Sequence, residues 1–390
     1  MKKMWVNRKL ADIGEFNPRE AMVKGKIAKK ISMDKLRPFC RDIAEFDLEV
    51  YSGGTKFRNG DTIMARITPC LENGKTAKVD ILEKDEVGFG STEYIVFRKK
   101  EGIDEDFLYY LVCSPIVREA AIKSMVGSSG RQRVQMDVVQ NLVVKVPVLE
   151  EQQKIAGILK VCDDKIALNN KENDNLQQQA QLLYENFITT IDETPIAISK
   201  VIDVRDGTHD SPKPFEAGYP LVTSKHLLPF GVDVISPNKI SEFDYNKINK
   251  RSKVDTNDIL LSMIGTVGLV SLIIEDEINF AIKNVGLFKT SKCPQYAYYL
   301  LCYLKSKETA QHIEKCLAGS TQKYISLTEL RKMPIIIPDV VDINKFNNLV
   351  TPLFRLIIEN VKANKVLTAI RDRLLPKFMS GKLDVSGLDL

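Results

Sequence analysis

The stretch that decides the fold of this chain is EEQQKIAGILKVCDDKIALNNKENDNLQQQAQLLYENF, from Glu150 to Phe187. Its apolar residues recur at alternating steps of three and four, which predicts a helix that packs against a second helix in a coiled coil. About 38 helical residues would span roughly 57 Å, which is longer than a small domain is wide. An amphipathic helix on one globular domain is the alternative that this spacing leaves open. The predicted seam consists of Ile155, Leu159, Cys162, Ile166, Asn169, Asn173, Leu176, Ala180, Leu183 and Phe187.

The same seam recurs 191 residues further along the chain, with both asparagines at matching positions. A buried asparagine costs stability unless it finds a partner, so we expect Asn169 and Asn173 to bond to Asn360 and Asn364. Arg371 is the one residue whose polarity does not match the first copy. The second seam consists of Phe346, Val350, Leu353, Ile357, Asn360, Asn364, Leu367, Arg371, Leu374 and Phe378.

Two prolines argue that the second helix is the shorter one. Pro352 would cost about 3 kcal/mol in a helix interior. Thr351 can instead serve as an N-cap with Pro352 at the first helical position, which predicts that this helix is split. Pro376 similarly weakens the prediction that the helix reaches Phe378.

The regions before the two long helices mix short strands with helical segments, and their parts come in the same order. The turn and buried strand from Gly60 to Ile67 resemble Asn257 to Ile264, and the Gly-Ser loop after Gly127 resembles Gly319 to Lys323. In the first region, Asp104 to Met125 is predicted as one helical segment. The segments before Gly60 and before Asn257 share almost nothing that aligns, which suggests one frame that carries two different surfaces.

The sequence therefore predicts an α+β fold with an internal pseudo-two-fold repeat. Two similar mixed α/β domains are separated by two long helices that form an antiparallel coiled coil. The predicted boundaries are 1–149 for the first domain, 150–190 for the central helix, 191–339 for the second domain, 340–380 for the C-terminal helix and 381–390 for a tail.

Composition places the chain among globular proteins of a reducing compartment. It has 390 residues, 44% of them hydrophobic, and a formal net charge of +5, which permits anion binding without requiring it. Its seven cysteines form no CxxC pair, and no apolar run approaches the length of a membrane span. We expect a cytoplasmic protein with no signal peptide and no membrane role.

No catalytic constellation is visible. Asn73-Gly74-Lys75-Thr76 lacks the first glycine of a phosphate loop, since Pro69 stands there. The chain has no GxGxxG after a strand and no NPP or DPP core of an amino-methyltransferase. His209, His226 and His312 are far apart without carboxylates or cysteines at ligand spacing, so no metal site is predicted.

Polar loops offer the side chains that contact phosphates and base edges in DNA. Two of these loops occupy matching positions after a Gly-Ser turn. An ordinary solvated loop would have the same composition, and this alternative stays open. The candidate DNA-binding residues are Arg66, Asn73, Lys75, Ser128, Ser129, Arg131, Gln132, Arg133, Thr208, His209, Lys225, Ser320, Thr321, Gln322 and Lys323.

Several stretches resemble the DNA-specificity subunit of type I restriction-modification systems, and the resemblance covers nearly the whole chain. PVLEEQQKIAGIL at Pro147 to Leu159 is similar to the family's EQQKIA helix start, and RDRLLPKFMSGKLDV at Arg371 to Val385 is similar to its C-terminal helix end. GGTKFRNGDTIMARITPCLENGKTA, GSTEYIVFR and DGTHDSP look like its target-recognition domains. PDVVDINKFNNL at Pro338 departs from the second EQQ-type start.

The resemblance implies two target-recognition domains that each read one half of a split double-stranded DNA sequence, with the paired helices fixing the spacing. Expected partners are two adenine-methyltransferase subunits and motor-nuclease subunits. The resemblance implies no catalysis and no cofactor on this chain; S-adenosylmethionine, ATP and Mg are expected on the partners. Two rival hypotheses are a coiled-coil scaffold that joins two protein-binding domains without DNA, and an enzyme whose site the sequence does not reveal.

Overall fold

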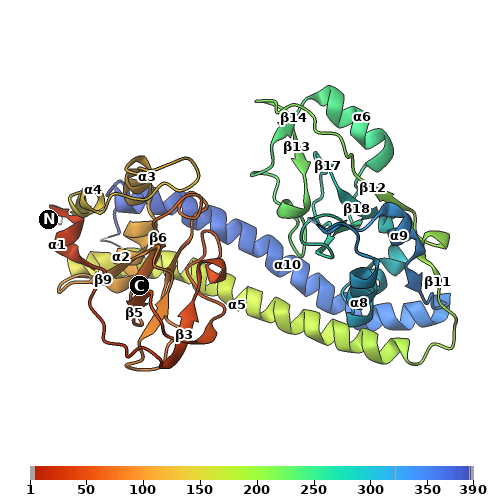
Figure 1. The fold of residues 1–390 in the computed structure, drawn as a ribbon, viewed down its shortest axis with the longest axis horizontal. Helices are drawn as coiled ribbons and strands as arrows, with labels where there is room; N and C mark the ends of the chain where they lie inside the picture. Colours follow the sequence, from red (N-terminus) through yellow and green to blue (C-terminus); the bar gives the residue numbers. More distant parts are fainter. Residues whose placement is uncertain (1–4, 321, 386, 388–390) are drawn as a thin grey trace. The chain divides into compact units, whose positions relative to one another are not determined.

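The computed structural model describes residues 5–320, 322–385 and 387, and it divides into two compact units. Unit 1 comprises residues 1–169 and 363–390, and unit 2 comprises residues 170–362. Two helices of 40 residues each contribute to both units, α5 (Leu149–Ile188) and α10 (Val340–Met379) (Figure 1).

Helix α10 is as long as α5, so the prediction of a split and shorter second helix is wrong. Pro352 lies inside α10 and is exposed, while Val350, Phe354 and Ile357 around it are at most 2% exposed. Burying these large side chains favours the continuous helix by more than the proline costs. Pro376 also lies within the helix, which reaches Phe378.

The two helices run antiparallel within each unit, which confirms the predicted seam. In unit 1, Asn169 Nδ2 donates to Asn364 Oδ1 over 2.8 Å. In unit 2, Asn360 Nδ2 donates to Asn173 Oδ1 over 2.9 Å. The partner's number falls along α10 as the number rises along α5. Every predicted seam residue on both helices is buried or half-buried.

Arg371, the mismatch in the seam, is buried with a partner of opposite charge. Its Nη1 lies 2.6 Å from Asp163 Oδ1 on α5, and Tyr110 donates its hydroxyl to Asp163 Oδ2 over 2.7 Å. Burial disfavours the charge on Arg371, but the carboxylates of Asp163 and Asp372 outweigh it and raise the pKa of Arg371 above its ordinary value. The buried guanidinium is thus paired with a carboxylate, which compensates for the loss of its hydration.

Unit 1 contains two four-stranded sheets, one antiparallel and one with a parallel pair, β3 and β8. The antiparallel sheet has the order β2 (Gly14–Phe16), β9 (Tyr94–Lys99), β6 (Thr62–Ala65), β7 (Thr76–Lys78). The other sheet has the order β4 (Asp47–Val50), β3 (Ile27–Ile31), β8 (Gly88–Gly90), β5 (Thr55–Phe57). A separate pair is β1 (Val6–Lys9) with β10 (Val143–Val146).

The helical segment predicted for Asp104 to Met125 is two helices, because Pro115 opens a new helix after Ser114. Phe107, Leu111 and Val117 from these helices are fully buried in the core of unit 1. The helices of unit 1 besides α5 and α10 are α1 (Leu10–Ile13), α2 (Glu105–Cys113), α3 (Pro115–Lys123), α4 (Met136–Gln140) and the 3-10 turn η1 (Met33–Lys35).

Unit 2 repeats the antiparallel sheet of unit 1 strand for strand. Its order is β12 (Val204–Asp206), β18 (Val285–Phe288), β15 (Ile259–Ser262), β16 (Val270–Leu272). A second sheet has the order β14 (Lys239–Ile240), β13 (Tyr219–Val222), β17 (Ala281–Ile282), and β11 (Ile196–Ala197) pairs with β19 (Pro334–Ile335). The helices are α6 (Glu242–Ser252), α7 (Ala297–Leu304), α8 (Lys307–Cys316), α9 (Leu327–Lys332) and the 3-10 turns η2 (Ile198–Lys200), η3 (Ser224–His226), η4 (Thr290–Lys292) and η5 (Pro294–Tyr296).

The segments before the two central strands, whose sequences do not align, nevertheless form strands that pair in the same way. β3 pairs in parallel with β8 and antiparallel with β4, and β13 pairs in the same two ways with β17 and β14. The two units differ in the next element along the chain, since unit 1 adds the edge strand β5, whereas unit 2 has the helix α6 before β15. Strand pairing constrains backbone direction more than side-chain identity, so the likeness escaped sequence comparison.

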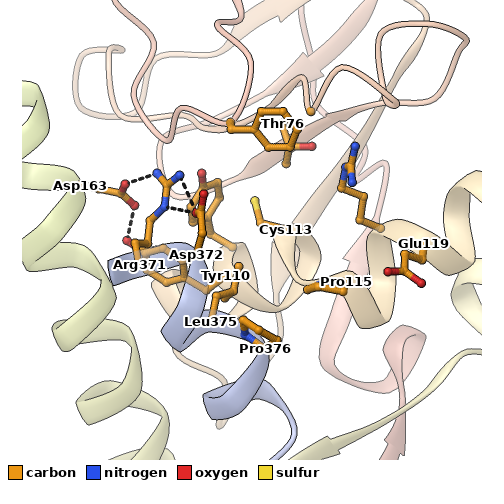
Figure 2. Close-up of a pocket in the computed structure, with 14 residues that line it drawn as sticks. Thr76, Tyr110, Cys113, Pro115, Glu119, Asp163, Arg371, Asp372, Leu375 and Pro376 are labelled. Carbon is orange, nitrogen blue, oxygen red and sulfur yellow. Dashed lines mark hydrogen bonds and ion pairs between the residues drawn. The ribbon is translucent and has the colours of Figure 1, made fainter. Parts of the chain in front are cut away.

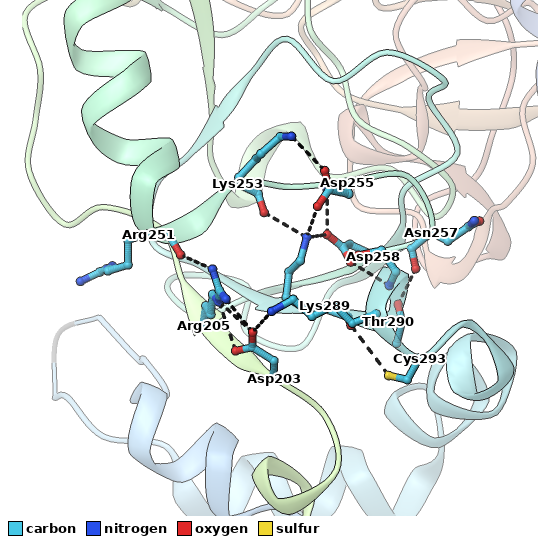
Figure 3. A network of polar contacts seen from close by, with 12 residues as sticks. Asp203, Arg205, Arg251, Lys253, Asp255, Asn257, Asp258, Lys289, Thr290 and Cys293 are labelled. Atoms are coloured by element: carbon cyan, nitrogen blue, oxygen red, sulfur yellow. Dashed lines mark hydrogen bonds and ion pairs between the residues drawn. The ribbon is translucent and has the colours of Figure 1, made fainter.

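Both units also repeat an ion pair between a buried aspartate and a cation at the end of the neighbouring strand. Arg98, next to the end of β9, pairs with Asp61 over 2.7 Å. Lys289, directly after β18, pairs with Asp258, and both side chains are at most 3% exposed (Figure 3). Each aspartate also accepts a backbone hydrogen bond from the residue three positions before it. The repeat therefore extends to the polar contacts that fix the turn before each central strand.

Candidate nucleic-acid interface

In unit 1, the Gly-Ser loop pairs with the chain that leaves β6. Arg133 forms isolated β-bridges with Ile67 and Val126, and Val134 donates its amide to Arg66 O over 2.9 Å. Gly127 sits at φ 133°, a left-handed conformation that suits glycine. These contacts bring Arg66, Gln132 and Arg133, which are distant in sequence, to the same end of β6.

Some of the candidate side chains in unit 1 hold the loops rather than point into solvent. Arg133 binds Glu93 over 2.7 Å, and this guanidinium holds the pKa of Glu93 below its usual value. Lys75 donates to Met33 O over 2.7 Å. Arg66 is half-buried, and its Nε has no hydrogen-bond partner among the residues that the structure describes. The exposed candidates are Asn73, Ser128, Ser129, Arg131 and Arg133, and Gln132 is half-buried.

In unit 2, the matching loop is built the same way around Tyr324. Tyr324 forms isolated β-bridges with Ile264 and Ala318, as Arg133 does in unit 1, and Gly265 donates its amide to Lys323 O over 3.2 Å. Ser320, Gln322 and Lys323 are exposed. Thr321 lies outside the described residues. In both units, therefore, the Gly-Ser loop pairs with the residues that follow a central strand, β6 in unit 1 and β15 in unit 2.

The DGTHDSP segment follows β12 and is held by its histidine. His209 Nε2 lies 2.9 Å from Asp206 Oδ2, and Nδ1 lies 2.8 Å from Asn284 Oδ1. Thr208 Oγ1 accepts a hydrogen bond from the amide of Asp210. Asn284 directly precedes β18, as Glu93 directly precedes β9, so these two residues occupy equivalent positions in the two units. This position holds the partner of Arg133 in unit 1 and the partner of His209 in unit 2.

Arg251 is a functional candidate that the sequence did not reveal, and it contacts Asp206, the first residue of the DGTHDSP segment. Arg251 Nη2 donates to Asp206 Oδ1 over 2.8 Å and to Gly207 O over 2.9 Å. These residues lie 45 positions apart, on a strand and on a helix that has no counterpart in unit 1, so no motif joins them. Lys225 is exposed in η3 and lines neither of the hollows beside His209.

His209 borders two hollows in unit 2. One, of about 430 Å³, lies between the DGTHDSP segment and α6 and is lined by Asp210, Lys247 and Arg251 among others. The other, of about 260 Å³, is lined by Ile264, Asn284 and Tyr324 among others. The candidate His209 therefore lies beside the end of the Gly319 loop, although more than 100 residues separate the two in sequence.

Unit 1 has a hollow of about 190 Å³ elsewhere, where α2 and α3 meet the ends of α5 and α10 (Figure 2). The ion pair of Arg371 and Asp163 lies on one side of it and Cys113 on another. Burial raises the pKa of Cys113 to about 12, so this thiol stays protonated and is a poor nucleophile at neutral pH. The hollow is mainly apolar and contains none of the DNA-binding candidates.

Among residues 5–320, 322–385 and 387, no helix is both long and apolar enough to cross a bilayer. The same residues contain no group of three or more His, Cys, Asp or Glu that could hold a metal ion.

Comparison with known proteins agrees with this duplicated architecture. The profile of the Type I restriction modification DNA specificity domain matches residues 2–178 and 214–357. The MjaIX type I restriction enzyme specificity subunit of Methanocaldococcus jannaschii is 28% identical over 318 residues, which cover 74% of this chain and 71% of that protein. The HindI specificity subunit of Haemophilus influenzae is 23% identical over 408 residues, covering 84% of this chain and 87% of that protein.

A solved structure supports the fold, though not the function, of this chain. The S subunit of a type I restriction-modification system from M. genitalium superposes with a TM-score of 0.54 at 14% identity, covering 99% of this chain and 98% of that one. The duplicated α+β frame, the polar loops and the paired helices define a recognition subunit with two similar domains. The chain belongs to the family of type I restriction enzyme specificity subunits, which carry the Type I restriction modification DNA specificity domain.

Proposed function

We propose that this chain reads a two-part DNA sequence and directs adenine methylation, and with motor-nuclease subunits restriction, by its partner subunits. The observation that carries the proposal is the repeated loop arrangement. Exposed Ser, Arg, Gln and Lys side chains extend from the loops that pair with the residues following β6 and β15, the equivalent strands of the two similar domains. Such side chains contact phosphates and base edges.

In this proposal the residues 1–149 and 191–339 form target-recognition domains, and each reads one half of the target. The paired helices at 150–190 and 340–380 set the distance between halves and carry the two methyltransferase subunits. The chain itself performs no catalysis and binds no cofactor; the partners bind S-adenosylmethionine, ATP and Mg. The protein would act in the cytoplasm on double-stranded DNA.

A mutational test compares exposed basic residues on the two loops. We expect Arg131→Ala and Lys323→Ala each to weaken DNA binding by the complex about five- to tenfold, because each removes a cation that contacts DNA directly. The measurement is an electrophoretic mobility shift at 50 and 150 mM salt with the chain assembled with its methyltransferase partners. Lys84→Ala, which changes an exposed lysine outside both loops, serves as the control and should bind as the wild type does.

The scaffold alternative makes the opposite prediction for the same experiment. If the wild-type complex binds no DNA at 50 mM salt, or if both loop variants bind like the wild type, the proposed role of these loops is wrong. A loss of binding by Lys84→Ala equal to that of the loop variants would indicate a non-specific charge effect.

A further inference from the structure

We infer that Arg251 and His209 form a preassembled DNA-contacting pair in the second recognition domain, oriented by Asp206, and that Arg251 donates to a base edge rather than a phosphate. The inference rests on the proposed function and adds Arg251, which the polar-loop candidates did not include. The Asp206 side chain is 7% exposed, and each of its two carboxylate oxygens contacts one member of the pair.

Asp206 fixes the guanidinium of Arg251 on one side. Oδ1 accepts from Nη2, which also donates to the carbonyl oxygens of Asp206 and Gly207. Among the described residues all these contacts run through Nη2, so Nη1 is left to donate to a ligand. The Arg251 side chain is 62% exposed, and Figure 3 shows it extending from the end of α6 away from the pair of Asp203 and Arg205.

The backbone of Arg251 is fixed as well. Arg205 Nη1 donates to Arg251 O over 2.9 Å, and Arg205 is itself held by Asp203 through a contact of 2.6 Å. The end of α6 is thereby tied to β12, which carries Arg205 and Asp206. A side chain held at both its backbone and its head loses little conformational entropy on binding, which favours a specific contact.

Asp206 fixes His209 on the other side. Both ring nitrogens of His209 face protein oxygens, Asp206 Oδ2 and Asn284 Oδ1, so neither is directed at a ligand. The side chain is nevertheless 61% exposed. What His209 offers is therefore its ring face, which suits apolar contact or stacking with a base and not hydrogen-bonded readout.

The charges around the pair argue for a base edge. The 430 Å³ hollow has the carboxylates of Asp210 and Asp244 beside the cations Lys247 and Arg251. Carboxylates repel a phosphate, but a base edge presents both donors and acceptors, and an arginine donor facing guanine is the commonest specific contact. Because α6 has no counterpart in unit 1, this site would contribute to one half of the target only.

The test uses the chain co-expressed with its methyltransferase partners, on plasmids whose target site carries each single base change in turn. We expect Arg251→Ala to relax discrimination at one base pair of one half by at least about tenfold, with the other half read unchanged. Arg251→Lys keeps the charge but not the planar fork, and should relax the same position. Asp206→Asn should also relax discrimination at this base pair, but by a smaller factor.

His209 separates a ring-face role from a hydrogen-bonding role. His209→Phe should keep most of the methylation rate, whereas His209→Ala should lower it at all sites that need this contact. Lys250→Ala, on the same helix, exposed and outside the hollow, is the control and should leave discrimination unchanged. Thermal melting of each complex separates these effects from loss of folding.

Two outcomes overturn the inference while the proposed function stands. The first is a wild-type complex that methylates a two-part motif while Arg251→Ala and Arg251→Lys discriminate at every position as the wild type does. The second is His209→Phe being as impaired as His209→Ala. If the wild type methylates no two-part motif, the proposed function itself fails.

Discussion

Arg371→Ala is expected to lower the free energy of unfolding of unit 1 by about 3 to 5 kcal/mol, because it leaves the buried Asp163 carboxylate without its counter-charge. Asp163 is 5% exposed, so its carboxylate depends on the guanidinium for charge compensation. Urea titration followed by the fluorescence of Trp5 measures the effect, since this single tryptophan donates to Glu151 in unit 1.

Two further variants show whether the unpaired charge is the cause. Arg373→Ala changes an exposed arginine on the same helix and should shift stability by less than about 0.5 kcal/mol. Arg371→Met combined with Asp163→Asn removes both charges and keeps an oxygen for the Tyr110 hydroxyl, so it should recover more than half of the loss. An Arg371→Ala variant as stable as the wild type would show that the pair contributes little to the helix seam.

Lengthening both long helices by one heptad is expected to change the target without changing its halves. Seven residues inserted after Asn173 and seven inserted before Asn360 add about 10 Å to each helix and keep the seam in register. About 10 Å corresponds to about three base pairs of DNA. The unspecified gap should therefore grow by about three base pairs, and methylation at the original spacing should be lost.

A loop insertion provides the matched control for the lengthened helices. Seven residues inserted among the exposed positions Asp192 to Pro195, after α5, leave the seam untouched and should leave the gap unchanged. Sequencing of methylated adenines in plasmid DNA measures the length of the gap for both variants. Altered half-sequences, or an unaltered gap in the lengthened variant, would mean that the helices do not measure the spacing.

The helix seam was predictable because it depends on a pattern that is regular and local. Repeated spacing identified the buried faces. The asparagine pairs, Asn169 with Asn364 and Asn173 with Asn360, were recognisable because both copies of the seam carry asparagine at these positions. The effect of Pro352 was not predictable, since the gain from burying its neighbours depends on which surfaces meet in the folded chain. The break at Pro115 was readable in principle from its position after Ser114.

The candidate site was harder to predict because it depends on contacts between distant segments. The two Gly-Ser loops were found because their composition repeats. Arg133 and Lys75 were chosen as candidate DNA-binding residues, and each also contacts a protein group, Glu93 and Met33 O, that the sequence does not place beside it. Asp206 and Arg251 meet only through the packing of α6 against β12, and no spacing rule connects them.

The most direct test of two recognition domains on a shared helical frame is the sequence of methylated sites in DNA from cells that express this chain with its methyltransferase partners. The account predicts one interrupted motif with two specified halves. It also predicts that replacing residues 1–149 by those of a relative changes one half and leaves the other half and the gap as they were. An uninterrupted motif, or a replacement that changes both halves, would contradict it.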